Sequence, residues 1–155
     1  MNAIGTKKWA DAHPGQAINV GIAESNMAGL AAGLSASGLK PLTHTFGCFS
    51  SRRAFDQAFL SIGYAKNSVV MVGSDPGVTA TFNGGTHMPF EDMALYRSVP
   101  GGTVIEITDS VMLDSLLPKL IDLPGLRLAV SCDMLIAGRH FFPDDEPEAI
   151  GHKAL

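Results

Sequence analysis

The sequence predicts an α/β domain in which helices cover both faces of a parallel sheet. Short apolar runs alternate along the chain with longer segments whose apolar residues recur at helical spacing, which is typical of this class. The run at 68–72 is uncharged and rich in valine, as expected for a strand buried on both faces. Hydrophobic residues make up 46% of the 155 residues, which is enough for the core of a single domain.

The first half of the chain is expected to contain two strand–helix units. In order, these are a strand at 17–20, a helix at 24–37, a strand at 40–46 and a helix at 50–65. Met27, Leu30, Ala31 and Leu34 recur at helical spacing, so they are predicted to form the buried face of the first helix. Gly38 follows and favours the end of this helix, because glycine readily adopts the conformation needed there.

The second half continues the alternation. It is predicted to contain a strand at 68–72, a loop at 73–89, a helix at 91–98, a strand at 103–108, a helix ending near 123 and a strand at 126–131. Asp109 or Ser110 could cap the last of these helices. Open parallel sheets bind ligands at the carboxyl ends of their strands, so functional side chains are expected there.

Residues 1–137 are interpreted as the domain and residues 138–155 as a linker leaving it. The tail is acidic and carries proline, with Asp-Asp-Glu-Pro-Glu at 144–148, which is typical of a connecting segment. No strand is evident before residue 17, which leaves open whether the first strand of the fold is missing.

Composition and charge argue against several classes of protein. The net charge is −4 and the longest basic cluster is Arg52-Arg53, so a nucleic-acid partner is not expected. No apolar run approaches the roughly 20 residues that span a bilayer, so no membrane span is expected. Cys48 and Cys132 lie far apart and form no metal or redox spacing, which favours a reducing, cytoplasmic setting.

Glu24 is the first candidate functional residue. It is a single acid in an otherwise uncharged run, at the predicted start of a helix. One interpretation is a first-turn acid favoured by the helix dipole. The other is a shielded carboxylate that hydrogen-bonds a ring nitrogen of a ligand and can share its proton.

Phe46 and Phe49 lie where a predicted strand ends. They are either core aromatics or rings that stack on a flat heterocycle. Arg52 and Arg53 follow at the start of a helix, where the dipole disfavours cations. These arginines are either solvated, paired with nearby Asp56, or engaged with another ionic group.

The loop at 73–89 is long for a compact domain and rich in glycine, so it is a candidate binding loop. His87 is the only group in it that titrates near neutral pH. It is either simply exposed or part of a site. His44, on the predicted strand, could face either a site or the core.

Four segments together resemble the pyrimidine-binding domain of the transketolase family. They keep the family's order and spacing over roughly residues 9–131. They are the glutamate-bearing run at 19–34, Thr-Phe-Gly-Cys-Phe-Ser-Ser-Arg-Arg-Ala-Phe-Asp-Gln at 45–57, Gly-Gly-Thr-His-Met-Pro-Phe-Glu-Asp-Met-Ala-Leu-Tyr-Arg-Ser-Val-Pro at 84–100, and Ile-Thr-Asp-Ser at 107–110.

The resemblance implies thiamine diphosphate as cofactor, held between this domain and a diphosphate-binding domain. Glu24 matches the family's catalytic glutamate, which hydrogen-bonds the aminopyrimidine ring. Phe49 matches the aromatic that stacks on this ring, and Phe46 lines the same pocket. His87 matches a histidine that contacts the donor sugar's hydroxyls. Arg53 aligns with a family arginine and is grouped with the cofactor-binding residues.

The chain also departs from the family pattern. Asn83 replaces a common aspartate and Gly85 a common proline, which bears on substrate choice. No Gly-Asp-Gly motif with a downstream asparagine occurs, so this chain is expected to contribute no metal ligands. The resemblance then implies that Mg²⁺ and the diphosphate are held by a partner subunit, in a homodimer or heterotetramer.

The function implied is that of the carboxyl-side subunit of a split transketolase. Such a subunit transfers a two-carbon ketol unit between sugar phosphates, and it is active only with its diphosphate-binding partner. One alternative is a portion of an enzyme like deoxyxylulose-phosphate synthase. The other is a non-catalytic assembly or regulatory module.

Overall fold

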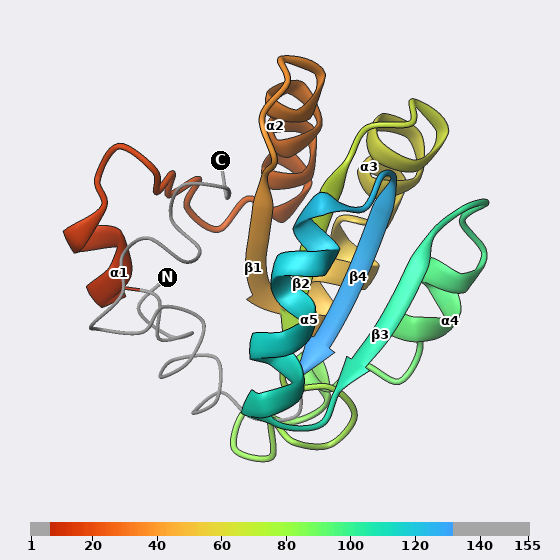
Figure 1. Cartoon of the computed structure of the whole chain (residues 1–155). Helices are drawn as coiled ribbons and strands as arrows, with labels where there is room; N and C mark the ends of the chain where they lie inside the picture. The colour runs from red at the N-terminus through yellow and green to blue at the C-terminus, as the bar shows by residue number, and fades with distance from the viewer. Residues whose placement is uncertain (1–6, 132–155) are drawn as a thin grey trace.

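The computed structural model describes residues 7–131, and in them the sheet is parallel throughout (Figure 1). Its strands lie in the order β1-β2-β4-β3. Their bounds are Leu42–Phe46 for β1, Val69–Ser74 for β2, Thr103–Ile107 for β3 and Leu126–Ser131 for β4. The predicted fold class is therefore confirmed, and so are the strands predicted at 40–46, 68–72, 103–108 and 126–131, with ends shifted by up to two residues.

Helices lie on both faces of this sheet, as predicted (Figure 1). The α-helices are α1 (Lys7–Ala12), α2 (Glu24–Ala36), α3 (Phe55–Gln57), α4 (Asp92–Arg97) and α5 (Ser110–Asp122). Two π-helical segments are η2 (Phe49–Arg53) and η3 (Ala58–Tyr64), and η4 (Gly85–His87) is a 3₁₀ turn. Asp109 caps α5, because its side chain accepts a hydrogen bond from Met112 N at 2.8 Å.

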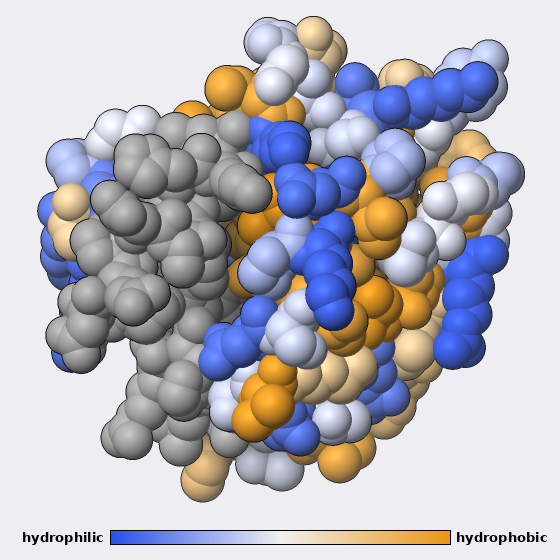
Figure 2. Space-filling model, viewed as in Figure 1, coloured by the Kyte–Doolittle hydropathy of each residue, from blue (hydrophilic) through white to orange (hydrophobic). Residues whose placement is uncertain are grey.

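Alternate side chains of β2 enter two separate cores. Val69 and Met71 pack with residues of α2, η3 and α4 on one face of the sheet. Val70 and Val72 pack under α5 on the other face. All six residues of β2 are buried, which confirms that this strand is covered on both sides. Charged side chains on the outward side of α5 lie among apolar residues (Figure 2).

The strand predicted at 17–20 is wrong, because these residues form an irregular segment. Asn19 Oδ1 accepts a hydrogen bond from Gly21 N at 3.0 Å, and Gly21 has a φ of 75°. An asparagine side chain that satisfies nearby backbone competes with strand pairing. The segment therefore turns locally and leads into α2 instead of extending the sheet.

The helix predicted at 50–65 forms, but its hydrogen bonding is wider than α-helical over much of its length. Ala65 N donates to Leu60 O at 3.2 Å and Asn67 N to Ile62 O at 2.9 Å, which are i→i−5 bonds. The helix also begins earlier than predicted, since η2 starts at Phe49. This puts the ring of Phe49 on the first turn, next to the end of β1.

The predicted buried face of α2 is only partly correct. The residues of α2 that are buried are Glu24, Ala28, Ala31 and Ala32. Met27, Leu30 and Leu34 instead line a cavity between α2, β1 and residues 16–22. The small alanine side chains let α2 pack closely against the sheet and η3, which turns the larger side chains towards the cavity.

Several predictions concern residues outside the described range. These are the domain boundary at 137, the linker at 138–155 and the setting of Cys132. Within residues 7–131, no helix combines the length and the apolar character needed to cross a bilayer.

Candidate functional site

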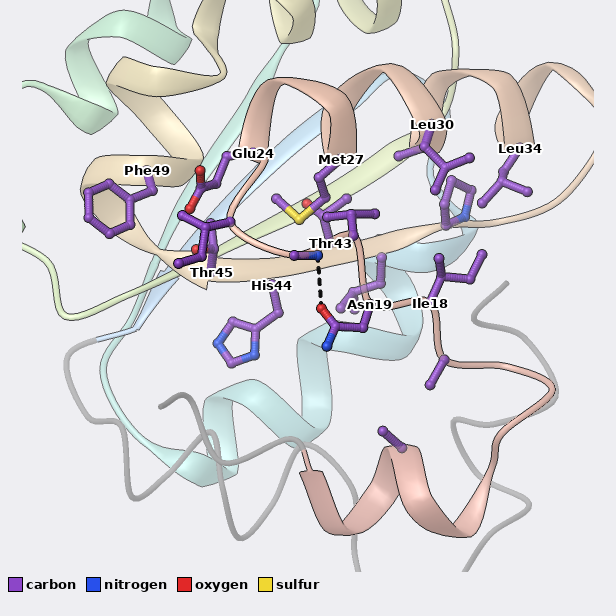
Figure 3. A pocket seen from close by; sticks show the side chains of 18 of the residues that line it. Ile18, Asn19, Glu24, Met27, Leu30, Leu34, Thr43, His44, Thr45 and Phe49 are labelled. Carbon is purple, nitrogen blue, oxygen red and sulfur yellow. Dashed lines mark hydrogen bonds between the residues drawn. The ribbon is translucent and has the colours of Figure 1, made fainter. Parts of the chain in front are cut away.

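A cavity of about 390 Å³ runs along the whole of β1 and reaches the edge of the sheet where the strands have their carboxyl ends (Figure 3). Its walls come from α2, from β1, from the segment before α2 and from the loop after β2. Glu24, Phe46, Phe49 and His87 all line it. Its volume falls within the range of small-molecule binding sites, and a parallel sheet is expected to bind a ligand at this edge.

Glu24 is the first residue of α2 and only 7% of it is exposed. Arg53 Nη1 donates a hydrogen bond to Glu24 Oε2 at 3.0 Å. The structure therefore favours the shielded carboxylate over the solvated helix-start residue. A buried carboxylate needs such a partner, because leaving it unpaired in an apolar site would be strongly unfavourable.

Three rings meet at the wall of the cavity nearest Glu24. Phe46 and Phe49 lie 5.9 Å apart between ring centroids, with the rings nearly perpendicular. The ring of His87 lies 5.2 Å from Phe46 and 4.9 Å from Phe49. The long loop thus brings His87 to the end of β1, although these segments are distant in sequence.

Arg53 contacts both the acid and an aromatic of this group. Its guanidinium carbon lies 3.9 Å from the centroid of the Phe49 ring, in addition to the bond with Glu24. Ser25 Oγ donates to Arg53 O at 2.8 Å, which ties the start of α2 to η2. These contacts fix the carboxylate of Glu24 relative to the ring of Phe49.

Asp56 does not pair with either arginine, so that interpretation is wrong. Arg52 Nε lies 3.0 Å from Glu91 Oε1, and Arg53 pairs with Glu24. Asp56 is exposed, and its carboxylate accepts a hydrogen bond from Gln57 Nε2 at 3.4 Å. From the wide turn of η2, Arg52 extends towards Thr86 and Glu91 and Arg53 extends towards α2, so neither points to Asp56 in α3.

His44 belongs to the cavity wall, which answers the question left open for it. Burial lowers the pKa of His44 to about 4, so the ring is neutral at pH 7. Thr43 and Thr45 of β1 line the same cavity. Consecutive residues of β1 line the cavity because β1 is the edge strand of the sheet, so no signal in the sequence alone set His44 apart.

Asp92 was not singled out from the sequence, where it looks like a first-turn acid. It is 6% exposed, and burial raises the pKa of its carboxyl group. A β-carbon added at Gly47 would lie 3.6 Å from Asp92 Oδ2 and 3.1 Å from Ser74 O. Asp92 therefore supports the turn that joins Phe46 to Phe49.

Comparison with known families identifies the family of the chain. The family described as "Transketolase, pyrimidine binding domain" matches residues 3–129. The chain belongs to the transketolase family. The resemblance seen in the sequence is thereby confirmed, and the family implies binding of thiamine diphosphate through its pyrimidine ring.

Curated relatives include transketolase subunits and related synthases. The chain is 51% identical over 121 residues to the 6-deoxy-6-sulfo-D-fructose transketolase subunit of Clostridium sp. (strain MSTE9), covering 78% of this chain and 38% of that protein. It is 33% identical over 123 residues to 1-deoxy-D-xylulose-5-phosphate synthase of Cutibacterium acnes (strain DSM 16379 / KPA171202), covering 79% and 19%. The chain thus spans less than two fifths of these relatives.

A solved structure shares the fold. It is titled "Split gene transketolase, inactive beta4 tetramer" and matches with a TM-score of 0.73 and 30% identity, over 86% of this chain and 43% of that one. The family, the fold and the relation to subunits of a split transketolase are therefore established.

The described residues fit the pyrimidine half of thiamine diphosphate. A shielded carboxylate can bond a ring nitrogen, and the aromatic group can pack on a flat ring. For a metal ion the residues described by the structure offer no comparable site. Within residues 7–131, no three His, Cys, Asp or Glu side chains lie close enough together to hold one.

Proposed function

We propose that this chain forms the aminopyrimidine side of a thiamine-diphosphate site and takes part in two-carbon ketol transfer together with a diphosphate-binding subunit. The observation that carries the proposal is a single cavity that joins buried Glu24 to the rings of Phe46, Phe49 and His87. No other described acid lines this cavity.

Glu24 and its neighbours have distinct roles in the proposal. The side chain of Glu24 shares a proton with the ring nitrogen of the aminopyrimidine through a hydrogen bond. Arg53 keeps this carboxylate in place through Oε2, so Oε1 is the oxygen that serves the ligand. Phe49 packs on the aminopyrimidine with the ring face that Arg53 does not cover, and Phe46 closes the edge of the pocket.

When bound, the cofactor supplies the electron sink that allows a ketose carbon–carbon bond to break. The chain's own residues place the reacting groups and exclude water. His87, whose Nδ1 lies 2.9 Å from Thr86 Oγ1, has Nε2 left to contact hydroxyl groups of the donor sugar. Neutral His44 adds an uncharged polar group to the cavity wall.

The partner in this proposal is a diphosphate-binding transketolase subunit that holds Mg²⁺ and the phosphates. The active unit would be a homodimer or heterotetramer in the cytoplasm. The related structure titled an inactive β4 tetramer supports the view that such a chain can assemble with itself yet needs another subunit for activity. The alternative, a non-catalytic assembly or regulatory module, predicts no cofactor binding by this chain even with the partner present.

The donor is proposed to be a ketose with an anionic group at its far end. Sugar phosphates are the general case, and 6-deoxy-6-sulfo-D-fructose is the specific donor to test, because the relative named for it is 51% identical. A second candidate is a synthase that forms deoxyxylulose phosphate, which the 33% identical relative supports. Product analysis separates the two, since only the first reaction transfers a ketol unit.

Calorimetry tests cofactor binding directly. Thiamine diphosphate with Mg²⁺ is titrated into the chain alone, the partner alone and their mixture. We expect tight binding only in the mixture, because the two halves of the site lie on two chains. Equal binding by the partner alone would contradict a role for this chain in the site.

A further inference from the structure

Arg52 contacts two residues that flank His87, one in the long loop and one at the start of α4. Its Nη2 donates a hydrogen bond to the backbone oxygen of Thr86 at 3.4 Å, and its Nε lies 3.0 Å from Glu91 Oε1. Arg52 belongs to η2, the helical segment that begins with Phe49. One side chain therefore fastens the loop that carries His87 to the segment that carries the stacking aromatic.

The position of the His87 ring depends on this loop. His87 N donates to Gly84 O at 3.0 Å, and the ring nitrogen Nδ1 lies 2.9 Å from Thr86 Oγ1. Glu91, at the other end, also accepts a hydrogen bond from Phe90 N at 3.0 Å. A shift of the backbone between Thr86 and Glu91 would therefore move the ring away from Phe46 and Phe49.

Arg53, the next residue, makes none of these loop contacts and instead binds Glu24 and covers Phe49. Two consecutive arginines thus hold different residues of the site in place. Arg53 lies on the side of the cofactor-binding acid, whereas Arg52 lies on the side of the histidine.

We infer that Arg52 is a positioning residue for His87 and thereby sets the affinity of the site for the donor sugar. The inference rests on the proposed function, in which His87 contacts the donor's hydroxyls. The Arg52 and Glu91 side chains are 43% and 35% exposed, so their ion pair is too weak to hold the fold together. This ion pair is nevertheless strong enough to favour one position of the backbone between Thr86 and Glu91.

The test uses the chain in complex with its diphosphate-binding subunit, with 6-deoxy-6-sulfo-D-fructose and D-fructose 6-phosphate as donors. Arg52→Ala should raise KM for the donor about 3- to 5-fold, the effect expected for losing an exposed ion pair and one hydrogen bond. The kcat and the affinity for thiamine diphosphate should stay within about twofold. Arg53→Ala should do the reverse, weakening cofactor affinity and lowering kcat.

Glu91→Gln should reproduce the effect of Arg52→Ala, and the double variant should be no worse than either single one, because both remove the same contact. Arg97→Ala, at an exposed arginine of α4, is the control for loss of a positive charge. An Arg52→Ala variant in which cofactor affinity and KM worsen together would overturn the inference, since that pattern indicates general damage.

Hydrogen–deuterium exchange separates this inference from the proposed function. Arg52→Ala should speed exchange in residues 84–91 and leave that of α2 unchanged, whatever the activity of the complex. Unchanged exchange in residues 84–91 would overturn the inference. A wild-type complex that binds cofactor yet transfers no ketol unit would instead contradict the proposed function.

Discussion

At the scale of single residues, Phe49 provides the clearest test of ring stacking. Its ring forms an edge contact with Phe46 and carries the Arg53 guanidinium 3.9 Å from its centroid. Phe49→Leu keeps most of the apolar volume and removes the aromatic face. Stacking adds about 0.5–1.5 kcal/mol beyond burial, so cofactor affinity in the complex should fall about 2- to 12-fold. Phe59→Leu, outside the cavity, is the matched control, and equal losses in both variants would contradict the assignment.

The burial of His44 should make the stability of the fold depend on pH. Burial lowers its pKa to about 4, whereas in the unfolded chain it is about 6.5. As the pH falls from 6.5 to 4 the unfolded chain gains a proton that the folded chain does not, so the free energy of unfolding decreases.

The expected decrease from this group is about 1–3 kcal/mol, allowing for its partial exposure. Urea denaturation at pH 7 and pH 5 measures it. His44→Gln should lose this part of the pH dependence while His13→Gln keeps it. Identical pH dependence in the wild type and His44→Gln would show that the ring is not shielded.

At the scale of elements, the end of β2 lies against the turn between β1 and η2. A β-carbon added at Gly73 would lie 2.8 Å from Gly47 Cα, closer than real contacts allow. Gly73→Ala must therefore push apart the turn that carries Phe46 and Phe49. We expect a loss of about 1–3 kcal/mol of stability by thermal or chemical denaturation.

Gly29→Ala is the matched control for this substitution. Gly29 lies in the interior of α2, and an added β-carbon would meet nothing within 4 Å. Alanine there should be neutral or stabilise the helix by up to about 1 kcal/mol. Comparable destabilisation by both substitutions would contradict the close approach of β1 and β2 at this point.

The elements differ in how far the sequence determines them. The strand β2 was predictable because burial on both faces requires a continuous apolar run. The π-helical form of η3 was not, because it depends on tertiary packing: a β-carbon at Gly63 would lie 2.5 Å from Val99 Cγ1. The false strand at 17–20 failed for a local reason, the side-chain bond from Asn19.

At the scale of the whole molecule, the candidate site combines segments that the sequence keeps apart. Glu24, Phe46, Phe49, Arg53 and His87 were each predicted from family resemblance, and the structure brings all five together. Three features could not be predicted: the ion pair between Glu24 and Arg53, the burial of His44, and the contacts of Arg52 with Thr86 and Glu91. They depend on how α2, η2 and the loop pack, which no local pattern encodes.

In the proposed function this chain provides one side of the cofactor site and needs a partner subunit for the other. It provides a shielded acid, an aromatic wall and a histidine in one cavity, whereas within residues 7–131 no metal-binding cluster is found. Under the proposed function, catalysis by the complex should depend on these side chains. That dependence is the central claim.

Ketol transfer by the reconstituted complex, with wild-type chain and with Glu24→Gln, tests this claim most directly. Glutamine keeps the shape of the side chain and cannot hold the exchangeable proton, so kcat should fall about 100-fold or more while the complex still assembles. Glu106→Gln, at an exposed residue of β3, serves as the control. A Glu24→Gln complex with full activity would contradict the account.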